Sequence, residues 1–119
     1  IGDVLISSPE WCKAPYLIEA VIYEFEKEEI SNEKIISSIL KKCLLKSDAL
    51  KMQKLAIEAL GKEYKILSPH NFVEILHNTL IKLAGHLKHL KELVIVAHNQ
   101  KHANALKKAF SDILNIKIP

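Results

Sequence analysis

The side chains best suited to chemistry are six histidines, all in the second half of the sequence. Two pairs have the spacing that places two imidazoles on one face of a helix, where a metal ion can bind: His86 with His89, and His98 with His102. Neither pair has the following glutamate that serves as the base in zinc proteases. No cysteine or carboxylate close in sequence completes a third ligand, so we expect solvated histidines and no metal site.

Motifs of enzymatic catalysis are not evident. The sequence contains no Gly-x-Ser-x-Gly elbow, no glycine-rich phosphate loop and no paired carboxylates that stand out from a solvated helix face. Cys12 and Cys43 both lie among apolar residues, which favours two buried thiols in a reducing compartment; a disulfide between them is the alternative. We therefore expect no enzymatic activity, no catalytic residues and no cofactor.

The positive charge comes from lysine alone, because the 17 basic residues include no arginine. Arginine supplies the fork that reads phosphates and guanine edges, so its absence argues against sequence-specific nucleic-acid recognition. Residues 61–119 hold 9 lysines against 4 acidic residues, whereas residues 1–60 hold 8 against 10. Trp11 is expected to pack on the core, and an exposed Trp11 would anchor a partner. The other candidate partner-binding residues are Lys82, Lys88, Lys91, Lys101, Lys107 and Lys108.

The elements that must position these side chains are predicted to be helices. Ser-Pro pairs at 8–9 and 68–69 are typical of helix starts, and apolar residues at helical spacing follow them. The run 93–97 is apolar on all sides and fits a helix or a strand; we favour a helix because its flanks are helical. The predicted helices cover about 8–29 (kinked or restarted at Pro15), 31–46, 47–60, 68–85, 86–99 and 101–114, with a connector at 62–67 and a loose tail at 115–119.

A weak internal repeat links the second helix to the fourth. At an offset of 37 residues, Ser31 aligns with Ser68 and Ile35 with Phe72. In period and apolar pattern only, residues 31–99 resemble HEAT and armadillo repeats. The resemblance implies an all-α fold of about six helices in antiparallel pairs, arranged as a right-handed stack; an irregular helical bundle is the alternative. Residues 1–119 are expected to form a single helical domain, cut from a larger protein.

These observations together predict a non-catalytic protein–protein interaction module, a scaffold segment within a larger intracellular protein, cytoplasmic or nuclear. Its partner would be another protein or peptide, an acidic one in particular. The alternative is a helical domain that binds nucleic acid through the lysine-rich C-terminal half. Self-association through the ends of the stack is a third hypothesis. No segment approaches the roughly 18 apolar residues of a membrane span, so no membrane partner is expected.

Overall fold

The structure, a computed structural model, shows a mixture of helices and strands and describes residues 4–7, 17–20, 23–24, 29–30, 33–59 and 67–114. The helices are α1 (Glu33–Ala49), α2 (Pro69–Leu83) and α3 (Gln100–Leu114). The strands are β1 (Val4–Ser7), β2 (Leu17–Ala20), β3 (Tyr23–Glu24), β4 (Glu29–Ile30), β5 (Lys54–Glu58) and β6 (Glu92–Val96). The all-α prediction is therefore wrong.

The first predicted helix, over 8–29, is also wrong where the structure describes it. Strands β1 and β2 pair antiparallel, and so do β3 and β4. Apolar residues at steps of four had favoured a helix here. Short apolar runs fit both periods, so periodicity alone does not separate the two structures. Residues 8–16, with the predicted cap and kink, lie outside the described residues.

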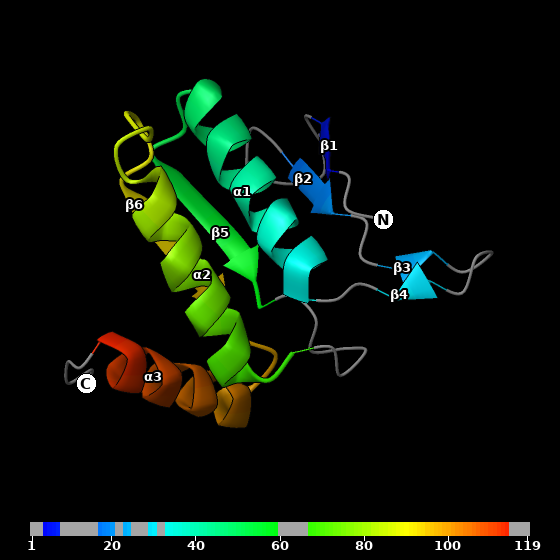
Figure 1. Cartoon of the computed structure of the whole chain (residues 1–119), viewed down its shortest axis with the longest axis vertical. Coiled ribbons are helices and arrows are strands. Elements are labelled where there is room, and N and C mark those ends of the chain that lie inside the picture. Colours follow the sequence, from blue (N-terminus) through cyan, green and yellow to red (C-terminus); the bar gives the residue numbers. More distant parts are fainter. Residues whose placement is uncertain are drawn as a thin grey trace.

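The element that organises the rest of the chain is a parallel pair of strands. β5 and β6 pair in register from Lys54 with Glu92 to Glu58 with Val96, and α2 forms the connection between them. Parallel strands need such a crossover, because a hairpin can join only antiparallel strands. Figure 1 shows α1 and α2 side by side in front of β5, with α3 crossing below them. The strand between α1 and α2 replaces the predicted antiparallel helix pair.

The core lies between the helices and one face of this sheet. Side chains alternate along both strands, and Ile57, Leu93 and Ile95 pack against the buried cluster. The opposite face carries Val94 and Val96, which are 37% and 44% exposed. The buried cluster contains residues from all three helices and from the connection between β5 and α2: Ile36, Leu40, Ala59, Leu67, Phe72, Val73, Leu76, Leu106 and Ala109.

The predicted helix over 86–99 is replaced by a loop and strand β6. The run Val94–Val96 consists of β-branched residues, which lose side-chain freedom in a helix and pack well on a pleated sheet. The partner strand β5 favours a strand over a helix here, and β5 lies within the predicted helix over 47–60. The apolar run is therefore a strand covered by helices on one face.

The predicted helix boundary at Ser47 does not exist, because α1 continues to Ala49. The Ser47 hydroxyl donates to the carbonyl of Cys43 at 2.6 Å, one turn back in the same helix. It therefore acts within α1 and does not cap a new helix. Residues 47–58 of the predicted third helix form the end of α1, a turn and strand β5.

α1 ends in a turn that places Lys51 in the left-handed backbone region, with a φ of 60°. The Lys51 N–H donates to the carbonyl of Asp48 at 2.9 Å, and the Met52 N–H donates to that of Ser47 at 3.0 Å. These two bonds define a Schellman motif, in which glycine usually occupies the position of Lys51. The Cβ of Lys51 makes this conformation costly for the backbone.

Replacement of Lys51 by glycine is expected to raise the free energy of unfolding by about 0.5–1 kcal/mol, because glycine removes the steric cost at a positive φ. Urea denaturation measures the difference. The matched control is Lys46→Gly, which places glycine inside the last turn of the same helix. That change should lower the free energy of unfolding by about 1 kcal/mol. Equal effects of the two changes would contradict the role given to the φ angle.

The helices expected over 68–85 and 101–114 do form, as α2 and α3. Ser68 caps α2, because its hydroxyl accepts the backbone N–H of Asn71 at 3.1 Å. Pro69 follows at the first helical position, where a missing N–H costs nothing. Within the ranges that the structure describes, no helix is both long and apolar enough to cross a membrane.

Candidate functional site

The carboxyl ends of β5 and β6 lie at the same edge of the sheet, because the strands are parallel. We call this edge, with the first turns of the following helices, the carboxyl edge. α2 and α3 begin 11 and 4 residues after the strands end, at Pro69 and Gln100. Helix N-termini present backbone N–H groups and the positive end of the helix dipole, which favour anions.

Each of these helices begins with a defined capping group. At α2 the group is Ser68, and at α3 it is Asn99, whose side-chain oxygen accepts the His102 N–H at 2.8 Å. The Asn99 carbonyl accepts the Ala103 N–H at 2.9 Å. The start of α3 is thus fixed immediately after β6, and His98 is held at the carboxyl edge.

His98 and His102 form a stacked pair at this point, with ring centroids 5.1 Å apart and planes inclined by 20°. His102 is only 4% exposed, so the prediction that the histidines are solvated is wrong for this residue. Its Nδ1 accepts the backbone N–H of His98 at 3.0 Å. A neutral ring then carries its proton on Nε2. His98 itself is exposed and is positioned by this contact.

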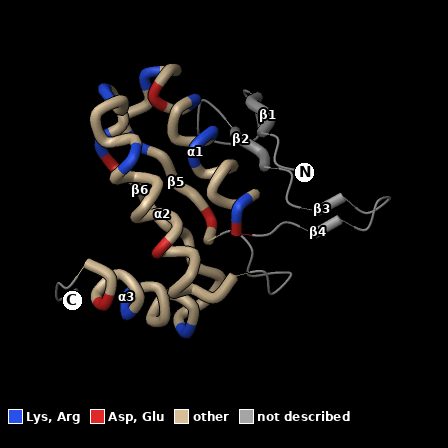
Figure 2. Tube along the Cα trace, in the orientation of Figure 1, with Lys and Arg blue, Asp and Glu red and all other residues tan. Residues whose placement is uncertain are grey.

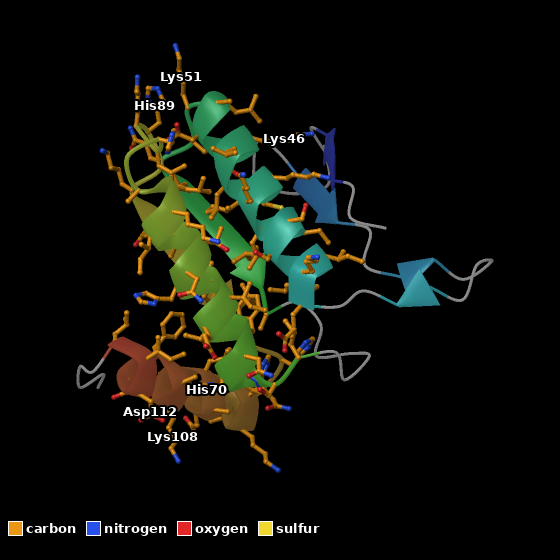
Figure 3. The ribbon with its side chains drawn as sticks, viewed as in Figure 1. Lys46, Lys51, His70, His89, Lys108 and Asp112 are labelled. Carbon is orange, nitrogen blue, oxygen red and sulfur yellow. The ribbon has the colours of Figure 1, made fainter. Side chains whose placement is uncertain are left out.

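A depression of about 300 Å³ lies between the first turn of α2 and the middle of α3. Its polar side chains are those of Ser68, His70, Lys108 and Asp112, and two alanines of α3 form an apolar part of the wall. Figure 3 shows His70, Lys108 and Asp112 gathered where α2 meets α3. The His70 imidazole also lies 3.9 Å from the Glu74 carboxylate, in an exposed pair.

The depression can bind a ligand that carries both an anion and hydroxyl groups. The Lys108 ammonium attracts an anion as a point charge, and the N-terminal end of α2 adds to that attraction. The Asp112 carboxylate can accept hydrogen bonds from hydroxyls, while an imidazole such as that of His70 can donate or accept. These groups come from two helices, which are fixed relative to each other by the core.

The predicted partner-binding lysines lie on two parts of the fold. Lys82 lies in the last turn of α2, and Lys88 and Lys91 precede β6, so these three lie toward the amino ends of the strands. The remaining three, Lys101, Lys107 and Lys108, lie on α3. Figure 2 shows lysines on both parts of the fold. Of the predicted set, Lys108 lines the depression; Trp11 lies outside the described residues.

The other predicted chemical groups are also separated. His86 and His89 lie in the turn and loop between α2 and β6, and both are exposed. Cys43 is buried in α1, and burial raises the pKa of its thiol, opposed in part by the charge of Lys46. Cys12 falls outside the described residues. Among residues 33–59 and 67–114, no three metal-binding side chains lie close enough to hold an ion.

His70 and Asp112 were missed as site residues. The Ser68–Pro69 helix start placed His70 in a first turn, which was a usable signal for an anion site. Asp112 had no such signal, because it lies 42 positions from His70 and only the packing of α3 on α2 brings them to one depression.

This arrangement of helices and parallel strands is an α/β fold of the macrodomain type. The structure matches a glycine-to-valine mutant of the Oceanobacillus iheyensis macrodomain with ADP-ribose, with a TM-score of 0.75 over 96% of this chain. Sequence identity in that match is 12%, and this chain spans 61% of the other. In sequence, the chain is 26% identical over 114 residues to the human protein mono-ADP-ribosyltransferase PARP14, of which it spans 6%. No family model matches the sequence.

These similarities correct several predictions. The fold is not a HEAT or armadillo repeat, because the matched structure is a macrodomain. The predicted protein-interaction scaffold and its generic protein partner are overturned, because the fold is that of a macrodomain and not of a helical repeat. The alternative, a helical domain that binds nucleic acid, loses the all-α fold on which it rested. The prediction that the chain is no enzyme is overturned as well, because the relative in sequence is named as a mono-ADP-ribosyltransferase and the matched fold is that of a macrodomain with ADP-ribose.

Proposed function

We propose that this chain binds ADP-ribose, free or attached to another protein, at the carboxyl edge. The observation that carries the proposal is the fold match over 96% of the chain to a macrodomain with ADP-ribose. A general rule of open α/β sheets supports the location, because ligands bind in the crevice outside the carboxyl ends of the parallel strands. The similarity to PARP14, a mono-ADP-ribosyltransferase by name, supports the same ligand class.

The side chains of the depression between α2 and α3 suit the chemistry of ADP-ribose. Its diphosphate is a dianion, which Lys108 and the start of α2 would attract. Its ribose hydroxyls would donate to Asp112. The depression of about 300 Å³ lies at the lower end of the volumes of ligand pockets, so it would hold part of the ligand.

Isothermal titration calorimetry with ADP-ribose tests the proposal, with ADP and ribose 5-phosphate as partial ligands. ADP-ribose should bind most tightly, because it alone offers both a diphosphate and two riboses. Binding of ADP-ribose no tighter than that of inorganic phosphate would contradict the proposed function.

Lys108→Gln is expected to weaken ADP-ribose binding by about tenfold, because one charge-assisted contact to the diphosphate is lost. The matched control is Lys107→Gln, which removes the same charge from the next residue of α3, outside the depression. The control should change the affinity less than about twofold at physiological salt, where separated exposed charges are screened. Equal weakening by both changes would show that net charge, and not this depression, attracts the ligand.

Hydrolysis of ADP-ribose from a modified protein is a second candidate function. The exposed His98 imidazole, positioned by His102 at the carboxyl edge, favours it. Water would form a bond to the sugar carbon while the bond to the acceptor oxygen breaks, and the imidazole would carry the proton from water to that oxygen. The measurement is release of ADP-ribose from a mono-ADP-ribosylated protein; no release would leave binding as the function.

The proposal includes the setting of the chain. We expect the chain to be one module of a larger protein, because the segment of PARP14 to which it is similar is 6% of that protein. An intracellular location is part of the proposal, because the thiol of Cys43 is free and buried, which suits a reducing compartment.

A further inference from the structure

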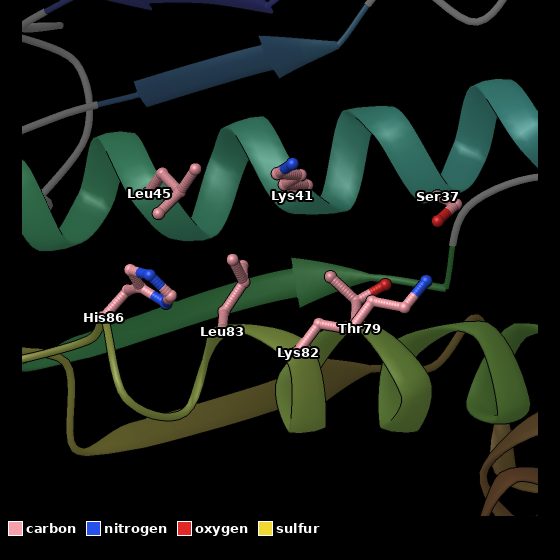
Figure 4. A pocket seen from close by; sticks show the side chains of 7 residues that line it. All are labelled: Ser37, Lys41, Leu45, Thr79, Lys82, Leu83 and His86. Carbon is pink, nitrogen blue, oxygen red and sulfur yellow. The ribbon is translucent and has the colours of Figure 1, made fainter.

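A second hollow lies away from the carboxyl edge, in a groove between α1 and α2. Its volume is about 320 Å³, within the range of pockets that hold small organic ligands. Figure 4 shows the groove between the two helices, with β5 behind it. Its lining comes from both helices and the turn after α2: Ser37, Lys41, Leu45, Thr79, Lys82, Leu83 and His86.

The inner part of the groove is largely apolar. Leu83 and Thr79 are each 5% exposed. The Thr79 hydroxyl donates a hydrogen bond to the carbonyl of Ile75 at 2.8 Å. Leu45 is 37% exposed and projects from α1 toward Leu83 of α2 across the gap. An apolar ligand group placed between these two leucines would remove the exposed part of Leu45 from water, which is favourable.

The rim of the groove is cationic. Lys41 on α1 and Lys82 on α2 are exposed on opposite walls, and His86 lies at one end. Among the residues that the structure describes, no carboxylate lines the groove. Within 33–59 and 67–114, Lys54 forms an ion pair with Glu92, and His70 forms one with Glu74. Neither pair includes a residue of the groove.

The fold gives a structural role to only one of these charges. Lys82 lies in the last turn of α2, where a cation interacts favourably with the helix dipole. Lys41 lies in the middle of α1, where that explanation fails. Two like charges facing one groove repel each other, and an anion between them would relieve the repulsion.

We propose that this groove binds a small organic anion with an apolar body, whose charged group contacts Lys41 and Lys82 and whose body lies against Leu45 and Leu83. A small molecule is favoured over a peptide segment, because the volume lies at the lower end of ligand pockets. The site is separate from the carboxyl edge and does not depend on the proposed function.

Methyl NMR titrations test this site with three probes. Phenyl phosphate and octanoate each join an anion to an apolar body, and inorganic phosphate is the anion without the body. We expect the first two to shift the methyl signals of Leu45, Leu83 and Thr79, with at least about tenfold tighter binding than inorganic phosphate. Equal affinity of all three probes, or shifts only at the carboxyl edge, would overturn the proposal.

The double change Lys41→Gln and Lys82→Gln should weaken phenyl phosphate binding by about tenfold, because both charged contacts are lost. The matched control is Lys91→Gln with Lys107→Gln, which removes the same charge from exposed residues outside the groove. The control should leave the affinity within about twofold. Equal loss in both double variants would refute the assignment.

Two further outcomes separate this site from others. Leu45→Ala should weaken octanoate and leave inorganic phosphate unchanged, because only the apolar contact is removed. The groove double variant should keep its affinity for ADP-ribose; a parallel loss of ADP-ribose binding would refute a separate site. Tighter binding of an acidic peptide than of either organic anion would overturn the choice of a small molecule.

Discussion

Phe72→Ala is expected to lower the free energy of unfolding by about 3–5 kcal/mol. Phe72 is 1% exposed and is the largest of the fully buried side chains among the described residues. It belongs to the cluster in which Leu40 of α1 and Leu106 of α3 also lie. Removal of the ring leaves a cavity where all three helices meet, and packed cores refill such cavities only in part.

Urea denaturation of Phe72→Ala and Ile81→Ala measures this effect within one helix. Ile81 is 62% exposed, so its replacement should change the free energy of unfolding by no more than about 0.5 kcal/mol. Phe72→Leu keeps most of the apolar volume and should cost about 1–1.5 kcal/mol. A loss for Phe72→Ala no larger than that for Ile81→Ala would contradict the central place of α2 in the core.

Asp48→Asn is expected to give the second large effect, a lower melting temperature and a weaker dependence of stability on acid. Asp48, at the end of α1, is 8% exposed. Its carboxylate oxygen accepts the backbone N–H groups of His89 at 2.6 Å and Leu90 at 2.9 Å. One side chain thereby fixes the loop before β6 to the end of α1.

These hydrogen bonds set the direction of the pH effect. The backbone N–H of Leu90, then that of His89, lower the pKa of Asp48 to about 2. A depressed folded-state pKa stabilises the protein fully above the unfolded-state pKa of about 4, and the contribution is lost as the pH falls toward 2. The difference in melting temperature between wild type and Asp48→Asn should therefore be constant above about pH 5 and shrink below pH 4.

Thermal melts at steps between pH 7 and pH 2 measure this difference in melting temperature. The other carboxylates are present in both proteins, so their effects on the melting temperature cancel in the difference. The matched control is Asp112→Asn, because Asp112 is an exposed aspartate on α3. It should leave the pH profile of the wild type nearly unchanged. A difference for Asp48→Asn that stays constant down to pH 2 would show that its carboxylate does not titrate as stated.

The helices with local signals were predictable from the sequence. Ser68 and Pro69 start α2 through contacts within one turn, and the period of apolar residues in α2 and α3 agrees with the faces they bury. A helix cap and an amphipathic face are determined by residues close together in the sequence, so their prediction does not depend on the rest of the chain.

The strands depended on contacts distant in sequence. Ser47 and Asp48 have the composition of a helix cap, yet Asp48 finds its partners 41 and 42 residues away. The apolar run in β6 fits a helix or a strand until β5 is recognised as its partner. Local propensity is a weak prior in such segments, because tertiary pairing overrides it.

The candidate site was the least predictable part. Lys108 was named, but as one of six lysines on a general basic surface. Its place beside His70 and Asp112 follows from the packing of α3 on α2. The spacing of His98 and His102 indicates two imidazoles on one helix face, whereas their position beside the carboxyl edge depends on the topology.

The parallel pairing of β5 and β6 also bears on the order of folding. Lys54 pairs with Glu92, 38 positions later, and every other pair has the same separation. A chain must close a loop of that length before the strands gain any contact, whereas α1, α2 and α3 can form locally. We therefore expect the carboxyl edge to form late, after the helix between its strands is in place. A ligand that binds at this edge would bind only chains that have completed folding, and it would stabilise the folded state by mass action.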